Sequence, residues 1–240
     1  RGIDAVYEGN PLMDAIAERC AAMPPREEFF RANGFGARSV IALLAGSRRS
    51  EVRNNLPFMA ALAELMPEYD FVLAAVPWLD RELYGELLAG SRIICLYDKT
   101  YEIVRYADAA VVTSGTATLE TALIGTPEVV CYRTDALTVW AGRRLLKIPY
   151  ISLVNLVMGR EVVKELIQQE MTPERAAEEL RAILPGGGQR ERMLADYDAL
   201  RKRIGGPGAS ERVAARMVAL LKGEKAPRPT EREQENGGAK

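Results

Sequence analysis

Two short glycine-containing segments carry residues that could bind an anion. Gly46-Ser47-Arg48 follows the apolar run 39–44, and Ser114-Gly115-Thr116 follows the apolar run 109–113. In each segment the glycine lets the backbone approach a ligand, and the N–H groups at the start of the next helix attract phosphate. Ser47 adds a hydroxyl, and Arg48 adds a guanidinium that can bind a phosphoryl group through two parallel hydrogen bonds. Taken alone, either turn could also be a simple connection between a strand and a helix.

Glu120 follows the second turn and lies one turn inside the helix expected over 117–124. A carboxylate there could accept hydrogen bonds from both hydroxyls of a ribose. The alternative is a capped helix that carries a surface Glu. Because both glycine turns follow strands of the same expected sheet, one shared site explains them better than two coincidences. The sequence therefore predicts a site for a nucleotide diphosphate.

Three further polar residues stand beside apolar stretches: Asn155, Glu165 and Gln168. Glu165 and Gln168 are three positions apart, so they would share one face of a helix over 161–168. Such a face could hydrogen-bond to sugar hydroxyls. On spacing alone, however, a solvated helix face is the better interpretation.

A parallel α/β sheet would bring these residues together. Apolar runs predict strands over 39–44, 70–76, 92–96, 109–113 and 128–132. Amphipathic spacing predicts helices over 50–66, 79–88, 103–106, 117–124, 135–146, 173–183, 191–204 and 210–221. The alternation favours right-handed crossovers and a Rossmann-like parallel sheet with helices on both faces. Ligands of such sheets lie beyond the carboxyl ends of the strands, where both glycine turns fall.

The composition excludes several classes of function. Lys plus Arg is 32 against 33 for Asp plus Glu, so no broad basic excess is present to bind nucleic acid. The chain has no histidine, which removes the commonest general base and metal ligand. We therefore expect no metal site and no cofactor. The three cysteines are far apart, as reduced thiols in a cytosolic protein would be, and no apolar run is long enough to span a membrane.

Several segments resemble the signature segments of the lipid-A-disaccharide synthase family, whose members are glycosyltransferases of the GT-B fold. These segments are GSRRSEV, VVTSGTATLETALIGTPEVVCYR, YISLVN and VVKELIQ, in this order, after an opening YEGNPLMD. The similarity runs from about Ala5 to Leu221 and implies the C-terminal half of a GT-B enzyme. We expect a nucleotide-sugar-binding domain over 1–222, a disordered tail over 223–240, and a missing N-terminal acceptor domain. The start at Arg1 rather than at Met also predicts a piece of a longer protein.

The resemblance implies a role for each matched residue. Gly46, Ser47 and Arg48 would face the diphosphate of UDP, Ser114, Gly115, Thr116 and Ala117 would line the same pocket, Glu120 would hold the ribose, and Asn155, Glu165 and Gln168 would bind nucleotide or glucosamine. The implied reaction transfers 2,3-diacylglucosamine from its UDP donor to 2,3-diacylglucosamine 1-phosphate, forming a β-1,6 disaccharide and UDP. A carboxylate of the missing domain would act as general base. Arg48 and the helix N-termini would stabilise the departing diphosphate without a metal.

The resemblance also implies partners and a location. These are the UDP-diacylglucosamine donor, the lipid acceptor and the cytoplasmic face of the inner membrane of a Gram-negative-type bacterium, with a homodimer left open. The basic, partly apolar stretch of Trp140, Arg143, Arg144 and Lys147 could contact that membrane, although a solvated helix is the simpler interpretation. Two positions depart from the family pattern, since Asn10 replaces a His and Ala45 replaces a Pro.

Three rival functions stay open at this point. The first is another GT-B enzyme of UDP-sugars, either a UDP-N-acetylglucosamine transferase or an epimerase. The second is a dinucleotide-binding oxidoreductase, which the absence of a GxGxxG turn disfavours. The third is a nucleotide-binding module without catalytic activity.

Overall fold

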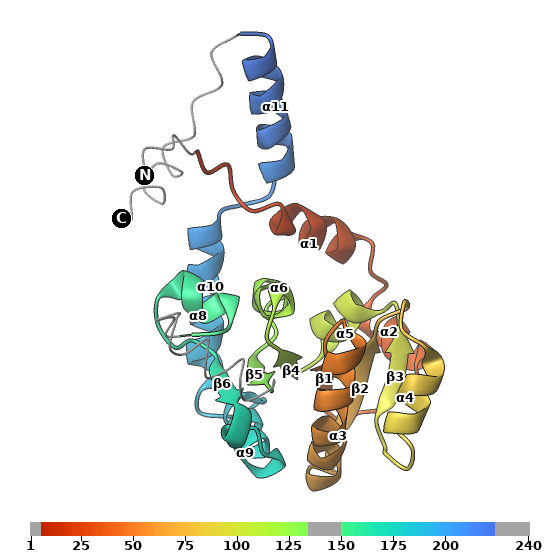
Figure 1. Cartoon of the computed structure of the whole chain (residues 1–240). Helices are drawn as coiled ribbons and strands as arrows, with labels where there is room; N and C mark the ends of the chain where they lie inside the picture. The colour runs from red at the N-terminus through yellow and green to blue at the C-terminus, as the bar shows by residue number, and fades with distance from the viewer. Residues whose placement is uncertain (1–5, 134–149, 224–240) are drawn as a thin grey trace. The chain divides into compact units, whose positions relative to one another are not determined.

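The computed structural model describes residues 6–133 and 150–223 (Figure 1). The chain divides into two compact units, one of residues 1–22 with 198–240 and one of residues 23–197. The helix predicted over 135–146 lies outside the described residues, as do Trp140, Arg143, Arg144, Lys147 and the tail from 224. The assignment of 1–222 to one nucleotide-sugar-binding domain stays a prediction.

The larger unit contains a parallel sheet of six strands in the order β3-β2-β1-β4-β5-β6. The strands are β1 (Val40–Leu44), β2 (Asp70–Ala75), β3 (Ile94–Tyr97), β4 (Ala109–Thr113), β5 (Glu128–Tyr132) and β6 (Lys164–Ile167). Ile41 of β1 lies opposite Phe71 of β2 and Ala109 of β4, so the strand order reverses on the two sides of β1. The predicted α/β class and parallel sheet are confirmed. At such a reversal point the loops after the central strands diverge and leave a crevice.

Helices form two groups around this sheet. The helices of the larger unit are α2 (Arg26–Ala32), α3 (Arg49–Leu65), α4 (Arg81–Leu87), α5 (Thr100–Tyr106), α6 (Thr116–Ile124), α8 (Leu153–Met158), the short 3-10 helix η1 (Gln168–Glu170) and α9 (Pro173–Ile183), and α10 (Arg190–Ile204) follows. Helix α3 contacts α4 and α9, whereas α6 contacts α5 and α8. With right-handed crossovers, this places α3, α4 and α9 on one face and α5, α6 and α8 on the other.

The central strands form the core because their residues are apolar on both faces. All five residues of β1 and all five of β4 are buried. A strand covered by helices on both sides reads as a continuous apolar run, which is why the sequence shows no alternation there. The polar residues of the two glycine turns begin where burial ends, with Ser47 and Gly115 exposed.

The prediction of a helix over 161–168 is wrong. Residues Lys164–Ile167 form the edge strand β6, which pairs with β5. In this pairing Glu165 lies opposite Val130. The local spacing of Glu165 and Gln168 suited a helix, but pairing with β5 buries Glu165 and Leu166 in the sheet instead. Gln168 begins η1 with a left-handed backbone (φ 55°), so it shares no helix face with Glu165.

The smaller unit joins residues from both ends of the chain. Helix α1 (Leu12–Ala21) contacts α11 (Ala209–Leu221). The Asp14 carboxylate accepts hydrogen bonds from the backbone N–H groups of Gly208 and Ser210, and these bonds lower the pKa of Asp14. Arg216 forms an ion pair with the buried Glu8. The Asp14 contacts therefore fix the start of α11, and the Glu8 ion pair holds its middle.

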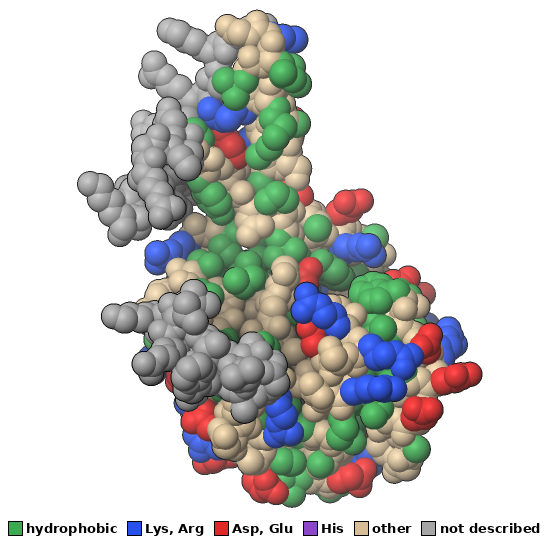
Figure 2. All heavy atoms as spheres, in the orientation of Figure 1, with side chains coloured by type: hydrophobic (Ala, Val, Ile, Leu, Met, Phe, Trp, Pro, Cys, Tyr) green, Lys and Arg blue, Asp and Glu red, His purple; other side chains and the backbone are tan. Residues whose placement is uncertain are grey.

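Charged side chains of both signs are interspersed on the face drawn in Figure 2, over the part of the larger unit that carries α3 and α4. One such pair joins Arg49 of α3 to Asp80, which precedes α4. This mixture agrees with the near balance of 32 basic and 33 acidic residues in the whole chain.

Candidate functional site

The turn after β1 leads directly into helix α3. Gly46 has a left-handed backbone (φ 108°), which a side chain rarely adopts. The N–H groups of Ser47 and Arg48 then point to one side, where both donate to Oε2 of Glu51 at 2.9 and 3.2 Å. Consecutive N–H groups that converge in this way form a concave anion-binding nest. We call the Ser47 and Arg48 N–H groups, with the Arg48 guanidinium, the β1 nest.

The loop after β2 holds this turn from outside. Trp78 donates its indole N–H to the Ser47 carbonyl at 3.0 Å, although 67% of the residue is exposed. The Arg49–Asp80 ion pair makes a second link between the same two loops. The peptide unit between Ser47 and Arg48 is therefore fixed at both its carbonyl and its N–H.

The turn after β4 also contains a glycine with a positive backbone φ. Gly115 lies at φ 152° and is followed directly by α6, and a Cβ added to it would meet no atom within 4 Å. The space over this glycine is thus open to a ligand that contacts the backbone. Ser114 donates its hydroxyl to the Ile151 carbonyl at 3.0 Å, which connects this turn to the segment before α8.

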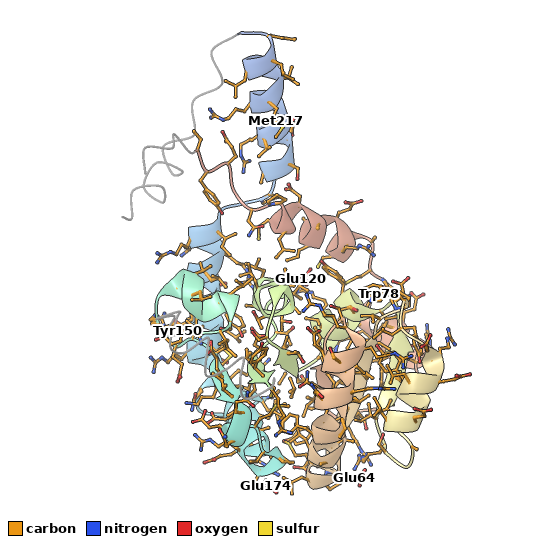
Figure 3. The ribbon with its side chains drawn as sticks, in the orientation of Figure 1. Glu64, Trp78, Glu120, Tyr150, Glu174 and Met217 are labelled. Carbon is orange, nitrogen blue, oxygen red and sulfur yellow. The ribbon has the colours of Figure 1, made fainter. Side chains whose placement is uncertain are left out.

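Both turns line one pocket of about 370 Å³. Its wall contains eight of the residues predicted from the sequence: Gly46, Ser47, Arg48, Ser114, Gly115, Thr116, Ala117 and Glu120. Glu51, Thr100, Ala74 and Val76 also line it. Glu120, which Figure 3 labels, accepts a hydrogen bond from the Tyr101 hydroxyl at 2.8 Å, and this bond holds its carboxylate on the wall. The pocket combines two helix starts with an arginine, which suits an anionic ligand.

A buried amide joins the two turns beneath the pocket. Asn55 of α3 donates to the Ala45 carbonyl at 3.1 Å and to the Thr113 hydroxyl at 2.9 Å. Ala45 follows β1, and Thr113 ends β4. One side chain therefore adds a link between the ends of two strands that already pair in the sheet.

Asn155 and Glu165 lie together but outside this pocket. Asn155 is fully buried, and its side chain makes four hydrogen bonds. Its amide oxygen accepts from the backbone N–H groups of Val162 and Val163, and its amide nitrogen donates to the Val163 carbonyl and to the Glu165 carboxylate. Glu165 in turn accepts from the backbone N–H groups of Ile151 and Ser152 at 3.0 and 2.9 Å. In this structure the two side chains hold the segment before α8, and through Ile151 they reach Ser114 of the β4 turn.

No group of three or more His, Cys, Asp or Glu residues that could hold a metal occurs in the described part of the chain. Asp196-Tyr197-Asp198 places two carboxylates close together in the sequence, but each is bound to an arginine. Asp196 contacts Arg160 at 2.6 Å, and Asp198 contacts Arg201 at 2.5 Å. Within residues 6–133 and 150–223, no helix is both long and apolar enough to cross a bilayer.

Comparison with known proteins identifies the family. A family model described as lipid-A-disaccharide synthetase matches residues 1–215. The chain belongs to this family. The resemblance seen in the sequence motifs is thus confirmed. The lipid-A-disaccharide synthase of Myxococcus xanthus is 39% identical over 226 residues, and that of Syntrophus aciditrophicus is 40% identical over 233 residues. These matches cover 92% of this chain but 58% and 59% of the two relatives.

Solved structures share the fold of this member of the lipid-A-disaccharide synthetase family. A putative UDP-N-acetylglucosamine 2-epimerase from Listeria monocytogenes aligns with a TM-score of 0.58 at 14% identity, covering 92% of this chain and 54% of that one. A UDP-GlcNAc 2-epimerase from Neisseria meningitidis aligns with a TM-score of 0.54 at 17% identity, covering 90% and 54%. At these identities the likeness concerns the arrangement of strands and helices.

The sequence reasoning missed several residues of the pocket. Glu51 carried a usable signal, because a Glu at the third position of a helix often reaches back to N–H groups before it. Thr100, and Tyr101 which holds Glu120, carried none, since the loop after β3 has no glycine turn to mark it. Their position became visible only when β3 was placed two strands away from β1.

Proposed function

We propose that this chain is the nucleotide-sugar-binding part of a glycosyltransferase of lipid A biosynthesis. The complete enzyme would transfer 2,3-diacylglucosamine from UDP-2,3-diacylglucosamine to 2,3-diacylglucosamine 1-phosphate. The products would be a β-1,6 disaccharide and UDP. The observation that carries the proposal is the pocket that both helix starts line, in a chain that matches the family over residues 1–215.

The pocket supports a division of roles among its residues. The β1 nest and the start of α6 would stabilise the negative charge that gathers on the diphosphate as it leaves the anomeric carbon. Glu120, held by Tyr101 on the pocket wall, would bind the ribose hydroxyls. Asn155 and Glu165 would act through the segment that reaches Ser114 rather than through the ligand itself.

The remaining steps need groups outside this chain. The chain spans just under three fifths of the two relatives' lengths. The general base that deprotonates the acceptor hydroxyl and the site of the lipid acceptor belong, in this proposal, to the other part of the protein. We also propose that the complete enzyme acts on the cytoplasmic face of the inner membrane, where both lipid substrates are held. No metal ion and no cofactor take part in the proposed reaction.

Calorimetric titration of this chain with UDP, ADP and NAD, with and without EDTA, tests the proposal. We expect UDP to bind more tightly than ADP or NAD, with an affinity that EDTA leaves unchanged. NAD binding in preference to UDP would instead favour an oxidoreductase. The full transfer reaction is then measured on the longer protein with its lipid acceptor, which separates transfer from epimerisation of the donor and from binding alone.

Replacing the arginine of the β1 nest gives a sharper test. Arg48→Ala should weaken UDP binding about ten- to a hundredfold, because hydrogen bonds to charged groups contribute about 1.5–3 kcal/mol. Arg53→Ala serves as the matched control, since Arg53 is an exposed arginine of the same helix that does not line the pocket. An equal loss in both variants would assign the effect to overall charge and contradict the proposed contact.

A further inference from the structure

The Glu51 carboxylate occupies the β1 nest. Its Oε2 atom accepts from the N–H groups of Ser47 and Arg48 at 2.9 and 3.2 Å. Its Oε1 atom lies 3.3 Å from Nη1 of Arg48. An anion bound at this turn would use the same three donors. In the structure, therefore, the donors that suit a phosphate already hold an anionic group of the protein itself.

The backbone makes room for this carboxylate. A Cβ added to Gly46 would lie 2.6 Å from both Cβ and Oε2 of Glu51. The glycine is thus required by the Glu51 side chain as it stands, as well as by any ligand that approaches the turn. Glu51 lines the nucleotide pocket, and 29% of its side chain is exposed, so solvent and ligand can reach the place where it lies.

A diphosphate and the Glu51 carboxylate cannot share these donors. Both are negatively charged, so they repel each other at contact distance. Each of the two backbone N–H groups also has a single proton to donate. A ligand that takes the β1 nest must therefore move the carboxylate away, and the carboxylate can return when the ligand leaves.

We propose that Glu51 is an internal competitor for the diphosphate, which takes the place of a phosphate oxygen when the site is empty. The inference rests on the proposed function and adds a specificity-determining residue to it. Only a ligand whose phosphate groups gain more from the β1 nest than Glu51 does can open the site. Uridine, which has no phosphate, gains nothing from displacing the carboxylate.

Two substitutions separate displacement from simple charge repulsion. Glu51→Gln removes the charge, and Glu51→Asp keeps the charge but shortens the side chain by one methylene group. Both should bind UDP about fivefold more tightly, the factor that corresponds to the ~1 kcal/mol typical of one capping side chain. Repulsion alone would raise the affinity of Glu51→Gln and leave Glu51→Asp unchanged.

Glu64→Gln is the matched control. It makes the same charge change on the same helix, but Glu64 is exposed and lies at the other end of α3, about 20 Å away at 1.5 Å per residue (Figure 3). We expect it to bind UDP as the unchanged protein does. Uridine affinity should be equal in all four proteins, and circular dichroism with thermal unfolding shows that each variant is folded.

The outcomes distinguish this inference from the proposed function. Equal or weaker UDP binding by both Glu51 variants, with binding by the unchanged protein intact, overturns the inference alone and makes Glu51 a fixed support of the turn. Binding of ADP as tight as that of UDP, with both Glu51 variants gaining affinity, contradicts the uridine-specific function but supports the competitor. Failure of all four folded proteins to bind UDP contradicts both.

Discussion

Glu128 at the start of β5 allows a direct test of the electrostatics in the core. Its carboxyl group is fully buried, and neither oxygen has a hydrogen-bond partner among the described residues. Burial without a partner raises the pKa of Glu128 well above its ordinary value of 4.5. We predict that Glu128→Gln stabilises the protein near neutral pH, because the amide has no proton to lose.

The sign and the magnitude follow from proton linkage. Below pH 4.5 the carboxyl is protonated in both the folded and the unfolded protein, so Glu and Gln should differ little. Above it the unfolded chain loses the proton and the folded protein keeps it. The free energy of unfolding then falls by up to about 1.4 kcal/mol per pH unit until the folded pKa is reached. Near neutral pH, which is about 2.5 units above 4.5, this linkage predicts a gain of up to about 3 kcal/mol for Glu128→Gln.

Urea unfolding of both proteins from about pH 4 to pH 8 measures this difference across the window set by linkage. Glu64→Gln again serves as the control, because Glu64 is exposed. Parallel pH profiles for Glu128→Gln and the unchanged protein would refute the reasoning. They would mean that Glu128 is ionised and paired with a cation, and the adjoining pocket of about 320 Å³ has Lys164, Arg175 and Arg192 on its wall.

Two further predictions concern the turns and their support. Gly46→Ala should lower the free energy of unfolding by about 1–2 kcal/mol for the left-handed backbone alone. It should also weaken UDP binding, because a side chain is strained at this left-handed position and would shift the two N–H groups of the β1 nest; unchanged calorimetric binding would show that the turn adapts. Asn155→Ala should cost about 3 kcal/mol or more in urea unfolding, since it leaves several buried partners unsatisfied. The exposed Asn54→Ala should cost almost nothing, and an equally small loss for Asn155→Ala would contradict the buried network.

Much of the sheet could be predicted because its central strands are buried on both faces. The runs that became β1 and β4 are continuously apolar, and each ends at a glycine turn that marks the carboxyl edge. Parallel strands place the turns after β1 and β4 at the same edge of the sheet, so the sequence could assign Gly46 and Gly115 to one site, and the structure brings them together because β1 and β4 are neighbours. This part of the site depends on chain direction rather than on side-chain detail.

Strand β6 could not be predicted because its four residues carry no pattern of their own. Lys164 and Ile167 are partly exposed at the edge of the sheet, and Glu165 is buried only because Ile151, Ser152 and Asn155 supply its partners. Those partners lie 10 to 14 positions away in the chain. A rule based on residues three or four positions apart cannot detect these contacts.

The same limit applies to Glu51. Its position in the helix was readable, but its contact with the β1 nest depends on the left-handed turn at Gly46 that brings two N–H groups together. The sequence shows a glycine and a glutamate five positions apart, and only the backbone shows that they require each other.

The amide of Asn55 has a consequence for the thermodynamics of binding. It bridges the Ala45 carbonyl and the Thr113 hydroxyl at the ends of two strands that already pair in the sheet, so the ends of β1 and β4 are held in place before any ligand arrives. The conformational entropy lost in ordering the floor of the pocket is therefore lost when the chain folds, not when the nucleotide binds. With a preorganised floor, the conformational change on binding is confined to side chains on the rim, such as Arg48 and Glu51. The strands keep their positions when the nucleotide binds.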